Sequence, residues 1–103
     1  YQNFPVITSA ASGTRVIAVT FRSKAGQPYK LDFYSSPAHT CDPSNYGEGK
    51  KWIGTVNVTT NVNGLWTGTV TASYGFLYGE AITATATDGA GRTSEFSACR
   101  NAR

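Results

Sequence analysis

The stretch that decides the fold reads AITATATDGAGRTSEFSAC and covers residues 81–99. Its first half alternates, because Ile82, Ala84 and Ala86 fall on one face of an extended chain and threonines fall on the other. This period of two is typical of a β-strand. Residues 88–91 then read Asp-Gly-Ala-Gly, a composition that tolerates the positive φ angles of a tight hairpin. The stretch therefore predicts two strands joined by a glycine turn.

Other alternating runs predict the remaining strands. The clearest is the one in which Tyr29, Leu31 and Phe33 alternate with Lys30 and its even-numbered neighbours. Turn-forming residues separate the runs. The expected strands cover residues 4–10, 14–23, 29–34, 52–60 and 65–73, in addition to the two strands of the hairpin. We therefore expect an all-β, two-sheet sandwich of about seven antiparallel strands, with no helix.

Aromatic side chains on the inward positions of these strands are expected to fill the core. They are Phe4, Phe21, Tyr29, Phe33, Trp52, Trp66 and Phe96. Trp66 shares its face with Gly68, and a glycine two residues from a large indole suggests that the ring covers the gap left there.

Length and composition are typical of a small extracellular β protein. A chain of 103 residues can build one two-layer core, so a single domain spanning residues 1–103 is expected. Hydrophobic residues make up 40% and charged residues only 15%, which favours a turn-rich secreted protein over a cytosolic enzyme. The sequence shows no membrane-spanning run, no signal peptide and no methionine. We therefore expect a piece of a larger exported protein.

Cys41 and Cys99 are the two cysteines of the chain. Neither has a partner at metal-ligand spacing or the context of a thiol nucleophile, so one disulfide is the simplest interpretation. On the chain-entropy model such a bond stabilises the fold by about 4 kcal/mol, and it implies an oxidising compartment. The alternative is two buried free thiols in a cytosolic protein, which the low content of charged residues disfavours.

Four segments resemble a known class of module. They read PVIT at residues 5–8, YKLDFY at 29–34, CDPSNYGEG at 41–49 and ATATDGAGRTSEFS at 84–97. Together they are similar to bacterial immunoglobulin-like modules, which recur in large secreted and surface-anchored proteins. The resemblance implies an immunoglobulin-like sandwich at an extracellular or cell-surface location, acting as a spacer, an adhesive unit or a carbohydrate-binding unit. It supplies no activity, and the chain departs from the usual pattern at residues 74–79.

Catalytic and metal-binding arrangements are not expected. His39 is the only histidine, and it lies in a loop without a nucleophile-elbow motif. Asp42 and Glu48 offer oxygen ligands of the kind that Ca²⁺ takes, but two carboxylates are few for a dedicated loop, so calcium is the weaker alternative there. The acidic residues show no spacing that pairs two of them for glycoside hydrolysis; they are Asp32, Asp42, Glu48, Glu80, Asp88 and Glu95. We expect no enzyme and no cofactor.

A net charge of +3 and a pI near 9.0 suggest an acidic partner. The basic residues are scattered, however, and Lys50 with Lys51 is the only adjacent pair. No aromatic and basic ribbon of the kind that binds single strands accompanies this pair, so nucleic acid is not expected. An acidic polysaccharide fits an extracellular setting better. We also expect a monomer that does not insert into membranes.

The loop at residues 74–79 carries the strongest indication of function. Tyr74, Phe76 and Tyr78 alternate there in a run that also holds Gly75 and Gly79, and exposed aromatic groups of this kind mark contact surfaces. Tyr34 and Tyr46 could extend such a surface. The alternative is that these rings plug the end of the sandwich, with at least one of them in the core.

The function expected first is that of a non-catalytic immunoglobulin-like module, a structural or adhesive unit of a secreted bacterial protein. The alternative is a carbohydrate-binding module of a polysaccharide-degrading enzyme. In that case sugar rings would stack on Tyr74 or Tyr78, and Lys50 and Lys51 would favour uronic acids. The sequence does not choose between the two, because both need only a rigid sandwich that bears a loop.

Overall fold

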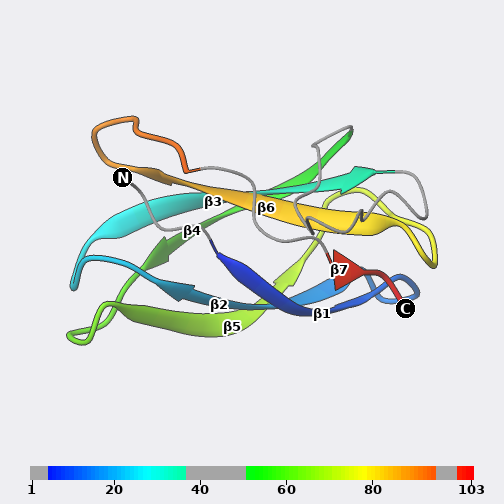
Figure 1. Cartoon of the computed structure of the whole chain (residues 1–103), viewed down its shortest axis with the longest axis horizontal. Helices are drawn as coiled ribbons and strands as arrows, with labels where there is room; N and C mark the ends of the chain where they lie inside the picture. The colour runs from blue at the N-terminus through cyan, green and yellow to red at the C-terminus, as the bar shows by residue number, and fades with distance from the viewer. Residues whose placement is uncertain (1–4, 37–50, 95–99) are drawn as a thin grey trace.

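A computed structural model describes residues 5–36, 51–94 and 100–103 of the chain. These residues form seven β-strands and no helix (Figure 1). The strands are β1 (Val6–Ala11), β2 (Val16–Arg22), β3 (Pro28–Ser36), β4 (Lys51–Thr59), β5 (Leu65–Thr71), β6 (Ala81–Asp88) and β7 (Arg100–Asn101). All five strand pairings are antiparallel, which confirms the all-β prediction. The described part of the chain contains no helix that could cross a membrane.

The strands form two sheets that face each other across a shared core (Figure 1). The three-stranded sheet has the order β1-β2-β5, and the four-stranded sheet has the order β4-β3-β6-β7. Both sheets contribute to one buried cluster, with Ile17 and Phe21 from β2 and Leu31, Phe33 and Ile82 from the opposite layer. Burial of each such side chain stabilises the fold by about 1.5–3 kcal/mol, so this cluster holds the two layers together.

The expected core aromatics of β2, β3 and β5 lie where the sequence predicts them. Phe21 and Tyr29 are buried and meet edge to face, with ring centroids 4.9 Å apart. Trp66 is partly buried and packs against the core. A Cβ atom at Gly68 would lie 3.0 Å from the Trp66 ring, which confirms that the indole covers this glycine.

Strand β6 is buried on both faces, although its sequence alternates. Ala84 and Ala86 point into the core as predicted, but Thr83 and Thr85 of the other face are buried as well. A strand between two neighbours has less access to solvent than an edge strand, and β6 lies between β3 and β7. The Thr83 hydroxyl has no hydrogen-bond partner within the described ranges.

The turn after β6 forms as predicted, with Gly91 at a positive φ and its N–H donating to the Asp88 carbonyl. Past the turn, Thr93 forms an isolated bridge with Thr87, and the next strand among the described residues is the two-residue β7. Arg100 of β7 pairs with Ile82. Most of the predicted second strand lies outside the described residues and stays a prediction.

Candidate functional site

A bulge at the start of β4 turns Trp52 outward. Phe33 pairs with Gly54 and Tyr34 pairs with Trp52, so Ile53 is an extra residue on β4 without a partner on β3. Ile53 is fully buried, whereas Trp52 is 43% exposed. The prediction that Trp52 belongs to the core was wrong, because the bulge reverses the in-and-out alternation that Val58 and Gly54 follow.

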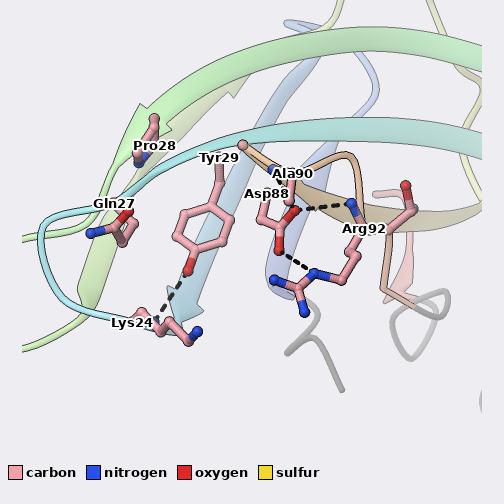
Figure 2. A pocket seen from close by; sticks show the side chains of 9 residues that line it. Lys24, Gln27, Pro28, Tyr29, Asp88, Ala90 and Arg92 are labelled. Atoms are coloured by element: carbon pink, nitrogen blue, oxygen red, sulfur yellow. Dashed lines mark hydrogen bonds and ion pairs between the residues drawn. The ribbon is translucent and has the colours of Figure 1, made fainter.

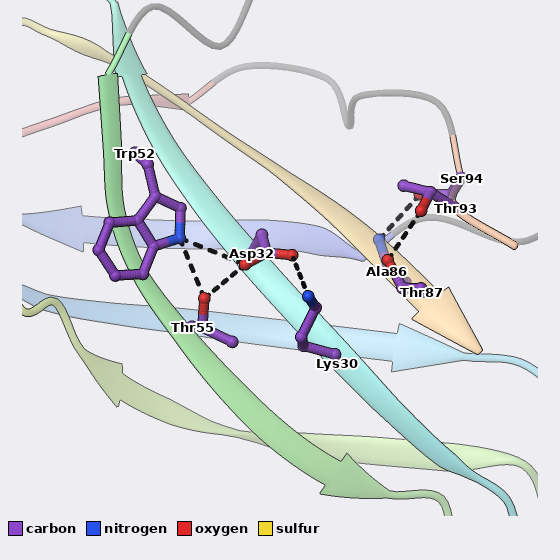
Figure 3. Close-up of polar contacts among 8 residues, drawn as sticks. All are labelled: Lys30, Asp32, Trp52, Thr55, Ala86, Thr87, Thr93 and Ser94. Atoms are coloured by element: carbon purple, nitrogen blue, oxygen red, sulfur yellow. Dashed lines mark hydrogen bonds and ion pairs between the residues drawn. The ribbon is translucent and has the colours of Figure 1, made fainter. Parts of the chain in front are cut away.

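Two hydrogen bonds fix the exposed indole of Trp52 (Figure 3). Its Nε1–H donates to Asp32 Oδ1 at 3.2 Å and to Thr55 Oγ1 at 3.0 Å. The Thr55 hydroxyl in turn donates to the same Asp32 oxygen. Asp32 and Thr55 are direct cross-strand partners on β3 and β4, so the sheet register itself builds this support. The ring is therefore held in one orientation before any ligand arrives.

Lys30 places a positive charge beside this network. Its Nζ lies 3.8 Å from Asp32 Oδ2, and its side chain is more exposed than that of Asp32. An ion pair open to solvent contributes little to stability. On this outer face of the sheet, Lys30 instead provides a hydrogen-bond donor and Asp32 an acceptor, and their charges balance.

Tyr74 reaches Trp52 from the end of the other sheet. The backbone N–H groups of Ser73 and Tyr74 both donate to the Ile53 carbonyl, at 2.8 and 3.1 Å, which binds the segment after β5 to the start of β4. The Tyr74 and Trp52 rings meet edge to face, with centroids 5.8 Å apart and an interplanar angle of 69°. Tyr74 is 54% exposed. We call Trp52 and Tyr74, with Asp32 and Thr55 beneath them, the aromatic surface.

The three aromatic residues predicted as one platform do not lie together in this way. Phe76 is 4% exposed and belongs to the core. This agrees with the alternative prediction, in which at least one of the three rings is buried at the end of the sandwich. Tyr78 and its neighbour Leu77 are each 74% exposed. Their turn is tied to the C-terminal segment, since Gly79 N–H donates to the Ala102 carbonyl. The structure thus gives Tyr74 a ring partner that the sequence did not indicate.

Of the two lysines predicted to favour acidic sugars, only Lys51 lies within the described residues. It is exposed and pairs with Ser35, one position from the pairing of Trp52 with Tyr34. Neighbouring residues of a strand point to opposite faces, so Lys51 leaves β4 on the side away from Trp52. Lys51 therefore does not join the aromatic surface.

Several predicted residues lie outside the described residues. They are Phe4, His39, Cys41, Asp42, Tyr46, Glu48, Lys50, Glu95, Phe96 and Cys99. Residues 5–36, 51–94 and 100–103 contain no group of three or more side chains suited to hold a metal ion. The disulfide and the weaker calcium alternative stay predictions.

No protein-family model and no curated protein sequence matches this chain. Its function is therefore argued from the chemistry of the aromatic surface. Two partly exposed rings present apolar faces, while a carboxylate and a lysine ammonium beside them can exchange hydrogen bonds with a polar ligand. Such a surface can bind a flat molecule that is apolar on its face and polar at its edge.

Proposed function

We propose that the chain is a non-catalytic, immunoglobulin-like module of a secreted bacterial protein that acts as an adhesive unit by contacting carbohydrate. The strand order supports the fold assignment. Immunoglobulin-type sandwiches hold strands A, B and E in one sheet and C, F and G in the other, and variable-type domains add C′ beside C. Here β1, β2 and β5 share one sheet and β3, β6 and β7 share the other, with β4 beside β3.

A secreted location agrees with the disulfide proposed between Cys41 and Cys99. The bond rests on the sequence argument, because no metal-ligand or nucleophile context accounts for these cysteines. The large share of threonine, serine and glycine on a two-sheet framework is in keeping with the same compartment.

The single observation that favours carbohydrate is the fixed, exposed indole of Trp52 beside Tyr74. Sugar rings present C–H groups on their faces and hydroxyl groups at their edges. Aromatic faces accept the former, and Asp32 and Lys30 are placed to bond the latter. Because the indole is already oriented, little side-chain entropy is lost on binding. The alternative of a carbohydrate-binding module attached to a degradative enzyme uses the same surface.

Affinity electrophoresis through gels that contain xylan, soluble chitin, alginate, pectin or mixed-linkage glucan tests this proposal. We expect at least one polysaccharide to retard the wild type, and Trp52→Ala and Tyr74→Ala to abolish the retardation while the far-UV circular dichroism stays unchanged. Val62→Ala is the matched control, since Val62 is 88% exposed in the turn between β4 and β5.

Two outcomes would contradict the proposal. Retardation by no polysaccharide would remove carbohydrate contact and leave a structural spacer. Loss of retardation in Tyr78→Ala but not in Trp52→Ala would move the contact to the tip of the loop at residues 74–79.

A further inference from the structure

A hollow of about 590 Å³ opens between the β2–β3 turn and the hairpin after β6 (Figure 2). Figure 1 shows these turns at one end of the sandwich and the start of β4, the strand that carries Trp52, toward the other end. The walls include Lys24, Gln27, Tyr29, Asp88, Arg92 and Thr93. Ligand pockets commonly measure roughly 300–1,000 Å³, so the hollow has room for a sugar-sized molecule.

Hydrogen bonds from the Thr60 and Tyr29 hydroxyls hold the β2–β3 turn that forms one wall of the hollow. The buried Thr60 hydroxyl donates to the Lys24 carbonyl at 2.6 Å and accepts from Gln27 N–H at 3.1 Å. The Tyr29 hydroxyl donates to Ser23 Oγ at 2.9 Å and accepts from Lys24 N–H at 3.3 Å. These bonds hold the backbone that carries Lys24 and Gln27 in place.

The opposite wall is fixed by Asp88. Its Oδ1 accepts the backbone N–H groups of Ala90 and Arg92, both at 2.9 Å, in a side-chain-stabilised turn. Its Oδ2 lies 3.3 Å from Arg92 Nε. Figure 2 shows the Arg92 side chain curling back toward Asp88, with Lys24 across the hollow. The ion pair thus places the exposed guanidinium beside Asp88, on the wall of the hollow.

The lining carries a net positive charge among its described residues, with Lys24 and Arg92 against the single carboxylate of Asp88. That carboxylate is already engaged by two N–H groups and Arg92 Nε, whereas Lys24 forms no ion pair with a described residue. An adjoining hollow of about 360 Å³ shares Tyr29 and Asp88 and adds Lys30 to its wall. The pattern suits a ligand that brings one negative charge.

We propose that the hollow binds a hydroxylated carboxylate with the chemistry of a uronic acid, its carboxylate held between Lys24 and Arg92. A simple ion would fill little of the volume. The Gln27 amide lines the same walls and supplies a partner for sugar hydroxyls. The Thr93 hydroxyl lies 2.9 Å from the Thr87 hydroxyl and keeps further hydrogen-bonding capacity for a ligand. Arginine recognises a carboxylate through paired N–H donors, and a lysine ammonium adds charge from the other side. This site is independent of the aromatic surface.

Titration of the ¹⁵N-labelled protein with D-glucuronate, with D-glucose and acetate as parallel arms, tests the site by NMR. We expect saturable shifts of amide signals in residues 24–29 and 88–93 with glucuronate and no such shifts with glucose. Lys24→Gln and Arg92→Gln should each weaken binding about tenfold or more, the loss typical of a charge-assisted contact. Lys51→Gln removes one charge from an exposed lysine elsewhere and should change nothing.

Three results would overturn the inference. One is the absence of saturable shifts with millimolar glucuronate. Another is equal binding of acetate, which would reduce the site to an anion site without sugar recognition. The third is equal weakening in Lys51→Gln, which would show that net charge and not the hollow governs binding. The Lys24 side chain is exposed, and the hydrogen bonds that Lys24 makes in the turn use only its backbone. Lys24→Gln should therefore fold normally, so it still tests the site if Arg92→Gln perturbs the turn after β6.

Discussion

The two tryptophans show how position, not residue type, decides the role of a side chain. Trp66 lies partly buried over Gly68 and packs on the core, while Trp52 lies outside it on a supporting carboxylate and hydroxyl. The first ring stabilises the fold, and the second is part of the exposed aromatic surface.

This difference predicts unequal losses on truncation. Trp66→Ala should lower the free energy of unfolding by about 3 kcal/mol, because it empties a partly buried aromatic site. Trp52→Ala should cost only about 1 kcal/mol, since its ring is partly solvated and Asp32 and Thr55 remain bonded to each other. Urea denaturation of both variants measures the two losses. Equal losses would place Trp52 in the core after all.

Asp88 predicts a component of acid sensitivity. Hydrogen bonding from the Arg92 backbone N–H, aided by Ala90 N–H and the Arg92 charge, holds the pKa of Asp88 below its ordinary 3.8 despite some desolvation. A lowered pKa in the folded state stabilises the fold at neutral pH, and this contribution is lost as pH falls through the folded-state pKa.

Asp88→Asn tests this acid sensitivity, because the amide keeps an oxygen acceptor for the turn but cannot titrate. We expect the free energy of unfolding of the wild type to fall more steeply than that of the variant as pH drops from neutral to below 3.8. Denaturant curves across that range give the comparison. Parallel pH profiles would show that Asp88 does not contribute.

At the scale of elements, β4 passes close to the segment after β5 at Gly54, where a side chain would be crowded. A Cβ atom at Gly54 would lie 3.2 Å from the Ser73 nitrogen and 3.4 Å from the Ala72 Cα. Those backbone atoms belong to the segment that delivers Tyr74 to Trp52. Gly54 therefore couples the packing of the two sheet ends to the geometry of the aromatic surface.

Gly54→Ala should lower the free energy of unfolding by about 1–3 kcal/mol through overpacking, and should weaken any polysaccharide retention by displacing Tyr74. Gly13→Ala is the matched control, since a Cβ there meets nothing within 4 Å. Thermal melts and affinity gels provide both readouts. Unchanged stability in Gly54→Ala would mean that the two segments separate without cost.

The sequence predicted the elements whose alternation is unbroken and missed the features that depend on irregular pairing. Tyr29, Leu31 and Phe33 obey the period of two, and their strand was predicted correctly within two residues. Trp52 did not, because a bulge is a property of the pairing between two strands and leaves only a weak local signal. That signal was the run Trp52-Ile53-Gly54, in which two large apolar neighbours compete for the inward face, and the bulge turns Ile53 inward and Trp52 outward.

The candidate site was predictable only in part for the same reason. Tyr74 was identified as a contact residue, but its partner lies on a strand of the other sheet, and no local pattern shows that two segments meet. The pairing of Asp32 with Thr55 could likewise not be predicted, because it depends on the β3–β4 register, which places the two residues opposite each other.

At the scale of the whole molecule, the C-terminal residues tie the two sheets together. Arg103 N–H donates to the Ala10 carbonyl, and Ser12 N–H donates to the Arg103 carbonyl, while β7 pairs with β6 of the other layer. The framework is thereby closed along this side, and Figure 1 shows the start of β4 and the turn after β6 toward opposite ends of it. The start of β4 carries Trp52 of the aromatic surface, and the turn after β6 borders the positively charged hollow. A rigid frame of this kind allows each surface to be altered without the other.

The most direct test of carbohydrate contact at the aromatic surface is the indole N–H region of the NMR spectrum, where Trp52 and Trp66 each give one signal. Oligosaccharides of xylan, chitin, alginate and mixed-linkage glucan are added in turn, and Trp52→Phe assigns the signals. We predict that at least one oligosaccharide shifts the Trp52 signal saturably and leaves the Trp66 signal in place, because only Trp52 stands on the outer face with its N–H bonded to Asp32 and Thr55. A Trp52 signal that none of these oligosaccharides moves would contradict the proposed function.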